Sequence, residues 1–225
     1  MDDIDWLISS ERVEYLEAIG IMNERVGSIQ KGEARELVWL LEHPPLYSAG
    51  TSAKLDDLLM PNRFPVFNTG RGGQYTYHGP GQRIVYIMLD LRRRRQDIRA
   101  YVSALENWII NTLAKFNIHG ERRSDRIGIW VRRTDIQQPN KEDKIGAIGI
   151  RIKRWVTLHG ISINISPNLE HFNGIIPCGI EGYGVTSFED MGQPIEFYDF
   201  DMELRNGFQK FFGARSEMGL KGYFC

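Results

Sequence analysis

The sequence lacks the features that mark secreted, membrane-spanning or nucleic-acid-binding proteins. Only two of its 225 residues are cysteines, Cys178 and Cys225, too few for a disulfide scaffold at this length. Lys plus Arg number 28 and Asp plus Glu 29, so the formal charge of −1 creates no field that favours nucleic acid or an anionic membrane. The N-terminus, MDDIDWLISSER, is acidic, unlike signal or transit peptides. No apolar run approaches the roughly 18 residues of a membrane span. We therefore expect a cytoplasmic protein with no nucleic-acid and no membrane partner.

Nucleotide and metal motifs are also missing. A P-loop needs a lysine directly after its glycines, and a dinucleotide fingerprint needs a third glycine that opens a helix. The most glycine-rich stretch, RGGQYTYHGPGQ from Arg71 to Gln82, has neither. The five histidines form no H-E-x-x-H pattern, and the two cysteines do not form a closely spaced pair of the kind that binds zinc. The sequence therefore predicts no bound metal and no cofactor.

The apolar residues that are present suffice for one core, and the length favours a single domain over residues 1–225. Spacings of three and four predict a helix over 13–29 that is entered near Ser9 or Ser10, a second from Ile98 that ends near Asn117 and Gly120, and a third over roughly 194–212, with a short helical piece at 54–59. Aromatic and β-branched runs predict strands in ELVWLL, FPVFNTG, RIVYIMLDL, IGIWVRR, KIGAIGIRI and WVTLHGISINI. This order predicts an α+β fold, with helices packed on one side of a mixed or antiparallel sheet.

The glycine-rich stretch Arg71 to Gln82 has two interpretations. Glycines between strands are common and often only permit a positive φ. This stretch has no aliphatic side chain, however, and its polar groups include Arg71, Thr76 and His78. We favour a loop whose bare backbone approaches a bound ligand.

Cys178 lies in IIPCGIEGYGVTSFED, directly between a proline and a glycine. A free cysteine usually packs as a small apolar residue, whereas a sharply turned, glycine-rich loop suits a nucleophile that needs oxyanion donors nearby. Both interpretations stay open on these residues alone. A nucleophilic thiol needs a base or cation beside it. The candidates for that partner are His78, His159, His171 and Lys144, the last at the start of KIGAIGIRI.

Taken in order, RGGQYTYHGPGQ, KIGAIGIRI, TLHGISINI and PCGI followed by VTS resemble the lipoyl(octanoyl) transferase family over about residues 42–189. The resemblance implies a catalytic domain like that of the biotin and lipoate protein ligases. It also implies that Cys178 carries the acyl group as a thioester, with Lys144 as its base. The residues that would bind the acyl substrate are Arg71, Gly72, Gly73, Gln74, Tyr75, Thr76, Tyr77, His78, Ala147, Ile148, Gly149, Gly160, Ile161 and Ser162.

The resemblance implies a reaction and its partners as well. An octanoyl group would pass from octanoyl-acyl carrier protein to one lysine of the lipoyl domains of 2-oxoacid dehydrogenases and of the glycine cleavage H protein. Two departures from the family pattern concern strand packing: RIVYIMLDL lacks a glycine and a proline, and Gly146 replaces an alanine. The alternatives are an ATP-dependent lipoate or biotin ligase, an octanoyl amidotransferase acting between protein domains, and a non-catalytic acyl-binding module.

A run of four arginines, Arg92 to Arg95, stands in LRRRRQD after a predicted strand. Such a run is usually the solvated start of a helix. Acyl carrier proteins are typically acidic, so part of the run could instead dock the donor. We expect charge reversal at Arg93 and Arg94 to slow association in that case, most strongly at low salt.

Overall fold

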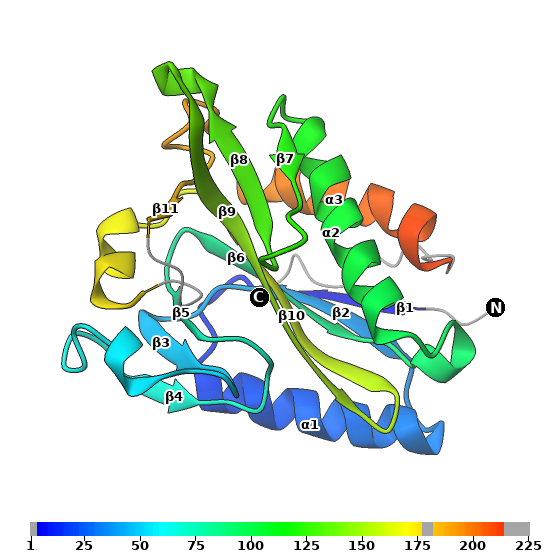
Figure 1. Ribbon diagram of the computed structural model, residues 1–225. Coiled ribbons are helices and arrows are strands. Elements are labelled where there is room, and N and C mark those ends of the chain that lie inside the picture. The colour runs from blue at the N-terminus through cyan, green and yellow to red at the C-terminus, as the bar shows by residue number, and fades with distance from the viewer. Residues whose placement is uncertain (1–3, 177–181, 214–225) are drawn as a thin grey trace.

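The computed structural model describes residues 4–176 and 182–213, which form two β-sheets and three α-helices (Figure 1). The large sheet has the order β1 (Ile4–Ile8), β2 (Glu36–Leu41), β6 (Gln82–Met88), β10 (Val156–Asn164), β9 (Gln138–Lys153), β8 (Ile129–Arg133) and β7 (Gly120–Glu121), and β11 (Gly184–Val185) pairs with β9. The small sheet has the order β4 (Val66–Asn68), β3 (Leu46–Ala49) and β5 (Tyr75–His78). Both sheets are mixed, since β1–β2, β3–β4 and β9–β11 are parallel and the other pairs antiparallel. The predicted α+β class is confirmed.

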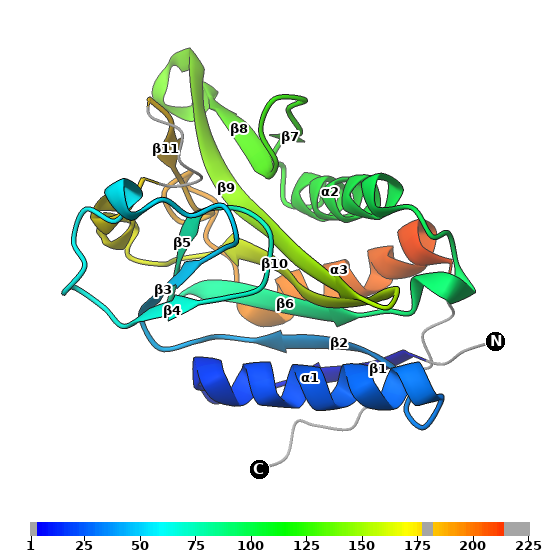
Figure 2. The same cartoon turned by 60° about the horizontal axis from the view of Figure 1, so that its bottom comes forward.

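The helices cover both faces of the large sheet, so the prediction of helices on one side is wrong (Figure 2). Helix α1 (Tyr15–Lys31) packs on one face against Leu37, Trp39 and Leu41 of β2. Helices α2 (Ile98–Ala114) and α3 (Phe197–Phe212) pack on the other, where Val38 and Leu40 point. The physical reason is visible in the sequence: a strand apolar at every position is buried on both faces, whereas one-sided cover gives alternation.

The three predicted helices are present, and their limits differ from the predictions by a few residues. Helix α1 begins at Tyr15 and not near Ser9 or Ser10, because residues before it continue along the sheet: Ser9 N donates to Leu40 O. The side chain of Asp97 caps α2 by accepting from Ala100 N. Strand β1 was not predicted, because Asp5 interrupts its apolar pattern.

Four of the twelve residues predicted as a bare loop, Tyr75–His78, form strand β5, and Gln82 begins β6. β5 pairs antiparallel with β3, and alternation of its side chains sends Tyr77 into a cluster with Tyr47 and Phe172. The loops are residues 71–74 before β5 and the turn 79–81 after it. The small sheet thereby holds the polar residues of β5 against the large sheet, next to β10 and β9.

Four 3-10 helices complete the described chain: η1 (Leu55–Asp57), η2 (Leu91–Arg93), η3 (Thr134–Ile136) and η4 (Leu169–Gly174). No helix within residues 4–176 and 182–213 is both long and apolar enough to cross a membrane. Over the same residues, no three His, Cys, Asp or Glu side chains gather where they could hold a metal ion.

Candidate functional site

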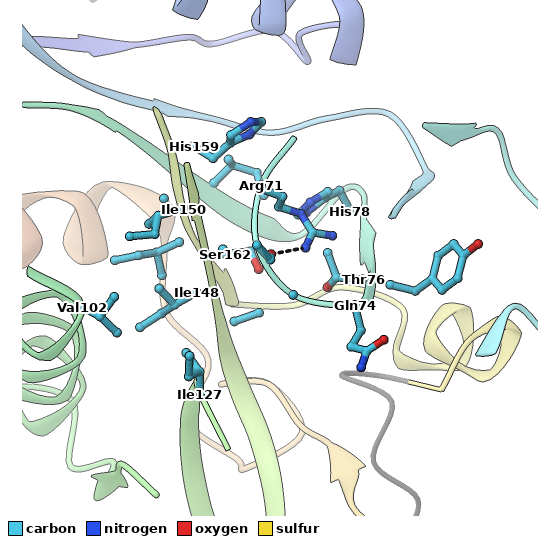
Figure 3. A pocket seen from close by; sticks show the side chains of 18 of the residues that line it. Arg71, Gln74, Thr76, His78, Val102, Ile127, Ile148, Ile150, His159 and Ser162 are labelled. Carbon is cyan, nitrogen blue, oxygen red and sulfur yellow. Dashed lines mark hydrogen bonds between the residues drawn. The ribbon is translucent and has the colours of Figure 1, made fainter. Parts of the chain in front are cut away.

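A cavity of about 380 Å³ lies between the loop Arg71–Gln74, strand β5 and strands β9 and β10. Its volume falls in the range of small-molecule sites. Lys144 and thirteen of the fourteen predicted binding residues line it; Tyr77 is the exception, since it points into the small-sheet cluster. In Figure 3, Val102, Ile127 and Ile148 gather on one side of the cavity and the polar Arg71 and His78 on the other.

The cavity has further lining residues that the sequence did not identify. Most come from segments with no motif of their own: the start of α1, strand β6, helix α2 and the loop before β8. Ile150 and His159 lie in the motifs KIGAIGIRI and TLHGISINI, and the sequence offered His159 as a candidate base but not as a lining residue. The unpredicted lining residues are Tyr15, Ile84, Tyr86, Val102, Asp125, Arg126, Ile127, Ile150 and His159.

Small residues make the close approaches around this cavity. A Cβ on Gly160 would lie 2.1 Å from the main-chain oxygen of Val85, and one on Gly149 would lie 2.8 Å from Arg71 Cδ. A side chain at either position would force the neighbouring backbone or the arginine to move. Gly73 adopts φ +92, a conformation that favours glycine.

Arg71 ties the loop to the small sheet. Its Nη2 donates to the main-chain oxygen and to Oγ of Ser48, both at 2.7 Å, and its Nη1 donates to Gly72 O at 3.0 Å. The guanidinium is buried, and a fork with several fixed acceptors holds a loop in one conformation. These contacts fix the position of the loop, and binding of substrate by Arg71 stays a prediction.

A β-bulge turns Lys144 toward the cavity. Ile129 and Trp130 of β8 lie opposite Gly146 and Lys144, so Ile145 is an extra residue in β9. Ile145 belongs to the core under α2 and α3, and a Cβ on Gly146 would also meet that core. Simple alternation from Gly146 would place the Lys144 side chain on the face of the core, but the bulge places it on the opposite face, toward the cavity. Bulges beside functional sites often redirect a side chain in this way.

The side-chain nitrogen of Lys144 is buried, and the surrounding residues leave it little space. Lys144 is 6% exposed, Nζ donates to Ile127 O at 3.1 Å, and Nζ lies 5.5 Å from the centre of the Trp130 ring. Gly128, at φ +131, leaves the space: a Cβ there would lie 2.7 Å from Nζ. Lys144 was expected at the start of a strand, but it lies inside β9 and is buried.

The histidines of the cavity are poor bases in this environment. Burial lowers the pKa of His78 to about 3, helped by nearby His43, and lowers the pKa of His159 to about 4. His78 Nδ1 lies 2.7 Å from Gln82 Oε1, a neutral partner. An imidazole that is hard to protonate accepts a thiol proton weakly. His171, another candidate, contacts Tyr77 Oη and is not among the residues that line this cavity.

Cys178 lies outside the described residues. The chain before this gap is fixed to the η1 segment, since Ile176 N donates to Asp57 O at 2.8 Å. After the gap, β11 runs parallel to β9 with Val185 opposite Lys144. Of these two described segments, β11 contacts a strand that lines the cavity, and Ile176 contacts η1, which does not line it.

The arginine run is engaged in internal ion pairs. Arg94 binds both carboxylate oxygens of Glu36, whose side chain is 1% exposed, and also donates to Phe212 O. Arg92 pairs with Asp90, and Arg95 with Asp97. Arg94 is therefore a structural residue, and the expected charge reversal at Arg94 would disturb the fold. Docking of a partner by the rest of the run stays a prediction.

Comparison with known proteins gives consistent matches. The model of the lipoyl protein ligase A/B catalytic domain matches residues 14–209. An octanoyltransferase of Bartonella henselae is 59% identical over 93% of this chain and 87% of its own length. Octanoyltransferases of Brucella melitensis and Agrobacterium fabrum are each 58% identical, over 94% and 97% of this chain and 82% and 84% of theirs.

Solved structures agree in fold at low sequence identity. A bi-partite lipoate protein ligase from Thermoplasma acidophilum superposes with a TM-score of 0.69 at 12% identity, covering 96% of this chain and 86% of the other. Lipoate-protein ligase A bound with ATP gives 0.65 at 13% identity, covering 96% and 89%. At such identities the likeness concerns the fold alone.

Proposed function

The chain belongs to the family of lipoyl protein ligase A/B catalytic domains, and from this we propose that it transfers octanoyl groups in protein lipoylation. The donor is octanoyl-acyl carrier protein, and the acceptor is one lysine of a lipoyl domain. The observation that carries the proposal is the 58–59% identity to octanoyltransferases over more than nine tenths of the chain. The ATP-dependent ligase alternative is supported only by structures at 12–13% identity.

The proposed chemistry has two steps. Cys178 Sγ attacks the carbonyl carbon of the donor thioester; the new S–C bond forms as the bond to the carrier thiol breaks. Lys144 takes the proton of the Cys178 thiol and returns it to the departing carrier thiolate. The acceptor amine then attacks the acyl-Cys178 carbonyl, an amide forms and the cysteine is released, with Lys144 taking the amine proton. A thioester is exchanged for a thioester and then for a more stable amide, so ATP is not consumed.

The cavity supports this proposal through its shape and lining. An octanoyl tail is slender and uncharged, and Ala147, Gly149 and Gly160 leave space beside bare backbone. Histidines that burial keeps neutral at pH 7 add no charge next to the tail. Lys144, buried at the same cavity, fits the role of proton acceptor. We place the reaction in the cytoplasm, where a nucleophilic thiol stays reduced.

The test is intact-protein mass spectrometry after mixing the enzyme with octanoyl-carrier protein in the absence of ATP. We expect a mass gain of one octanoyl group, and peptide mapping should assign it to Cys178. Cys225→Ala is the matched control because it removes the only other thiol and should still be acylated. Acylation of Cys178→Ala, or acyl transfer that requires ATP and survives this change, would favour a ligase.

The donor is tested separately. An octanoylated lipoyl domain and octanoyl-carrier protein are offered in parallel, and the rate of acylation of the enzyme is measured with each. Faster acylation by the octanoylated domain would assign the chain as an amidotransferase.

A further inference from the structure

A closed ring of hydrogen bonds and one ion pair passes through the main chain at Lys144. Arg133 Nη1 donates to Asp143 Oδ2 at 2.8 Å and forms an ion pair with Asp190 Oδ2 at 2.9 Å. The hydroxyl of Thr186 donates to the same oxygen of Asp190 at 2.7 Å, and Thr186 N donates to Lys144 O at 3.0 Å. Asp143 directly precedes Lys144, so the ring returns to its starting point.

The ring is buried at the members nearest Lys144. The side chains of Arg133 and Asp143 are 5% and 1% exposed, and Thr186 is buried. Strand β11 approaches as closely as backbone permits, since a Cβ on Gly184 would lie 2.3 Å from Asp143 Oδ1. A guanidinium holds two carboxylates in fixed directions, which a lysine ammonium cannot do.

The bulge explains why this position needs additional restraint. An extra residue interrupts the hydrogen-bond ladder between β8 and β9, and a shift of register by one residue moves a side chain to the opposite face. At Lys144, such a shift would turn the ammonium from the cavity to the core under α2 and α3. The ring fixes the residue before the bulge from two sides, β8 and β11.

We infer that Arg133 and Asp190 are positioning residues, which hold the main chain of β9 so that Lys144 Nζ lies in the acyl cavity. Neither residue lines the cavity, so they act through Lys144 and not on the substrate. The inference rests on the proposed function in one respect, namely that Lys144 is the base.

Asp135 provides a matched control for the role of Asp190. It binds Arg133 as well, through Nε at 3.0 Å and Nη2 at 2.8 Å, but it is no part of the ring. We expect Asp190→Asn to slow single-turnover acylation by an octanoyl thioester about ten- to a hundredfold through misplacement of Lys144, with KM unchanged. Asp135→Asn should stay within about threefold because the hydrogen bonds that Asp135 accepts from Arg133 lie outside the ring, although Asp135 is less exposed than Asp190, at 21% against 39%. Equal slowing by the two variants would overturn the inference, because Arg133 would then matter for stability alone.

A double-mutant cycle tests whether Asp190 acts through Lys144. In a Lys144→Ala background, Asp190→Asn should cause no further slowing, whereas an independent effect would multiply and refute the inference.

A second measurement does not depend on activity. The rate at which acetic anhydride modifies Lys144, relative to the exposed Lys115, is followed by mass spectrometry. This ratio should change in Asp190→Asn and not in Asp135→Asn, and an unchanged ratio in Asp190→Asn overturns the inference. If the wild-type protein is not acylated by the octanoyl donor, the proposed function fails, but this ratio still reports on the ring.

Discussion

The Gly128→Ala variant tests whether the space beside Gly128 is needed to position Lys144, as distinct from a loss of stability through backbone strain. At φ +131 an alanine is strained by about 1–2 kcal/mol, which corresponds to a fall in Tm of roughly 2–8 °C at this chain length. Its Cβ would also lie 2.3 Å from Cε and 2.7 Å from Nζ of Lys144, and 2.9 Å from Gly146 O. The main chain at Gly146 is fixed in the sheet, so the lysine has to move. A displacement of about 1 Å in a reacting group costs on the order of a hundredfold in rate.

The assay is single-turnover acylation by octanoyl-carrier protein, with thermal unfolding measured on the same samples. Gly32→Ala is the matched control, because Gly32 also has a positive φ, at +78, but an added Cβ would meet nothing within 4 Å. We expect both variants to lose stability and only Gly128→Ala to lose about two orders of magnitude in acylation rate. Wild-type acylation by a folded Gly128→Ala would refute the placement of Lys144 as the base.

Four further predictions follow from the same contacts. Lys144→Ala should slow acylation by about two to four orders of magnitude, and Lys144→Arg should be equally slow because a guanidinium keeps its proton. Stopped-flow measurements test both variants, and a wild-type rate of acylation in Lys144→Ala would indicate another base. His159→Gly removes a side chain that lines the cavity and should shift the preferred acyl chain to longer lengths. Arg154→Gly, on the exposed hairpin, is the control, because both residues have a positive φ, at +58 and +49, and it should leave the preferred chain length unchanged. Competition between octanoyl and decanoyl donors measures the preference. Arg95→Glu should slow association with the carrier protein at low salt and leave the rate of acylation by a small thioester donor unaffected. Arg94→Glu should instead lower the yield of folded protein, because the buried Glu36 would lose its partner. The pKa values of His43, His78 and His159 lie at about 4, 3 and 4 in the folded chain, below 6.5, so their contribution to stability is complete above pH 6.5 and is lost as the pH falls toward 4. Asp201, with a pKa raised to about 6, and Glu106, whose pKa burial also raises, act in the opposite direction. Urea unfolding at several pH values should show a smaller loss of stability in His159→Gly than in the wild type.

The sequence was sufficient for the family and for most secondary structure. The apolar runs of β2 and β6 and the helical spacing in α1, α2 and α3 reflect burial, which local patterns record directly. The faces on which the helices pack were predicted wrongly. The uninterrupted apolar runs of β2 and β6 indicate cover on both faces, and the prediction did not take them into account. Strand β1 was missed because Asp5 interrupts its apolar pattern.

The candidate site was predictable where its residues lie in motifs and not where they come from distant segments. The loop Arg71–Gln74, the small residues of β9 and β10, and Lys144 line the cavity as expected from the resemblance. Tyr77 does not, because the pairing of β5 with β3 fixes its direction toward the small-sheet core. The burial of Lys144 could not be predicted either, since the bulge arises from pairing with β8 and the space from Gly128.

The placement of the proposed base and of two other cavity residues on adjoining strands has a consequence for substrate selection. Lys144 and Ile150 lie on β9, six residues apart and so roughly 20 Å along the strand, and His159 lies opposite Ile150 on β10. A rigid sheet therefore sets the distance between Lys144 and the part of the cavity lined by Ile150 and His159. The loop Arg71–Gln74 closes one side of this space without defining its length. Changes in that loop should consequently alter the affinity for acyl groups in general, and changes at His159 should alter which chain length is preferred.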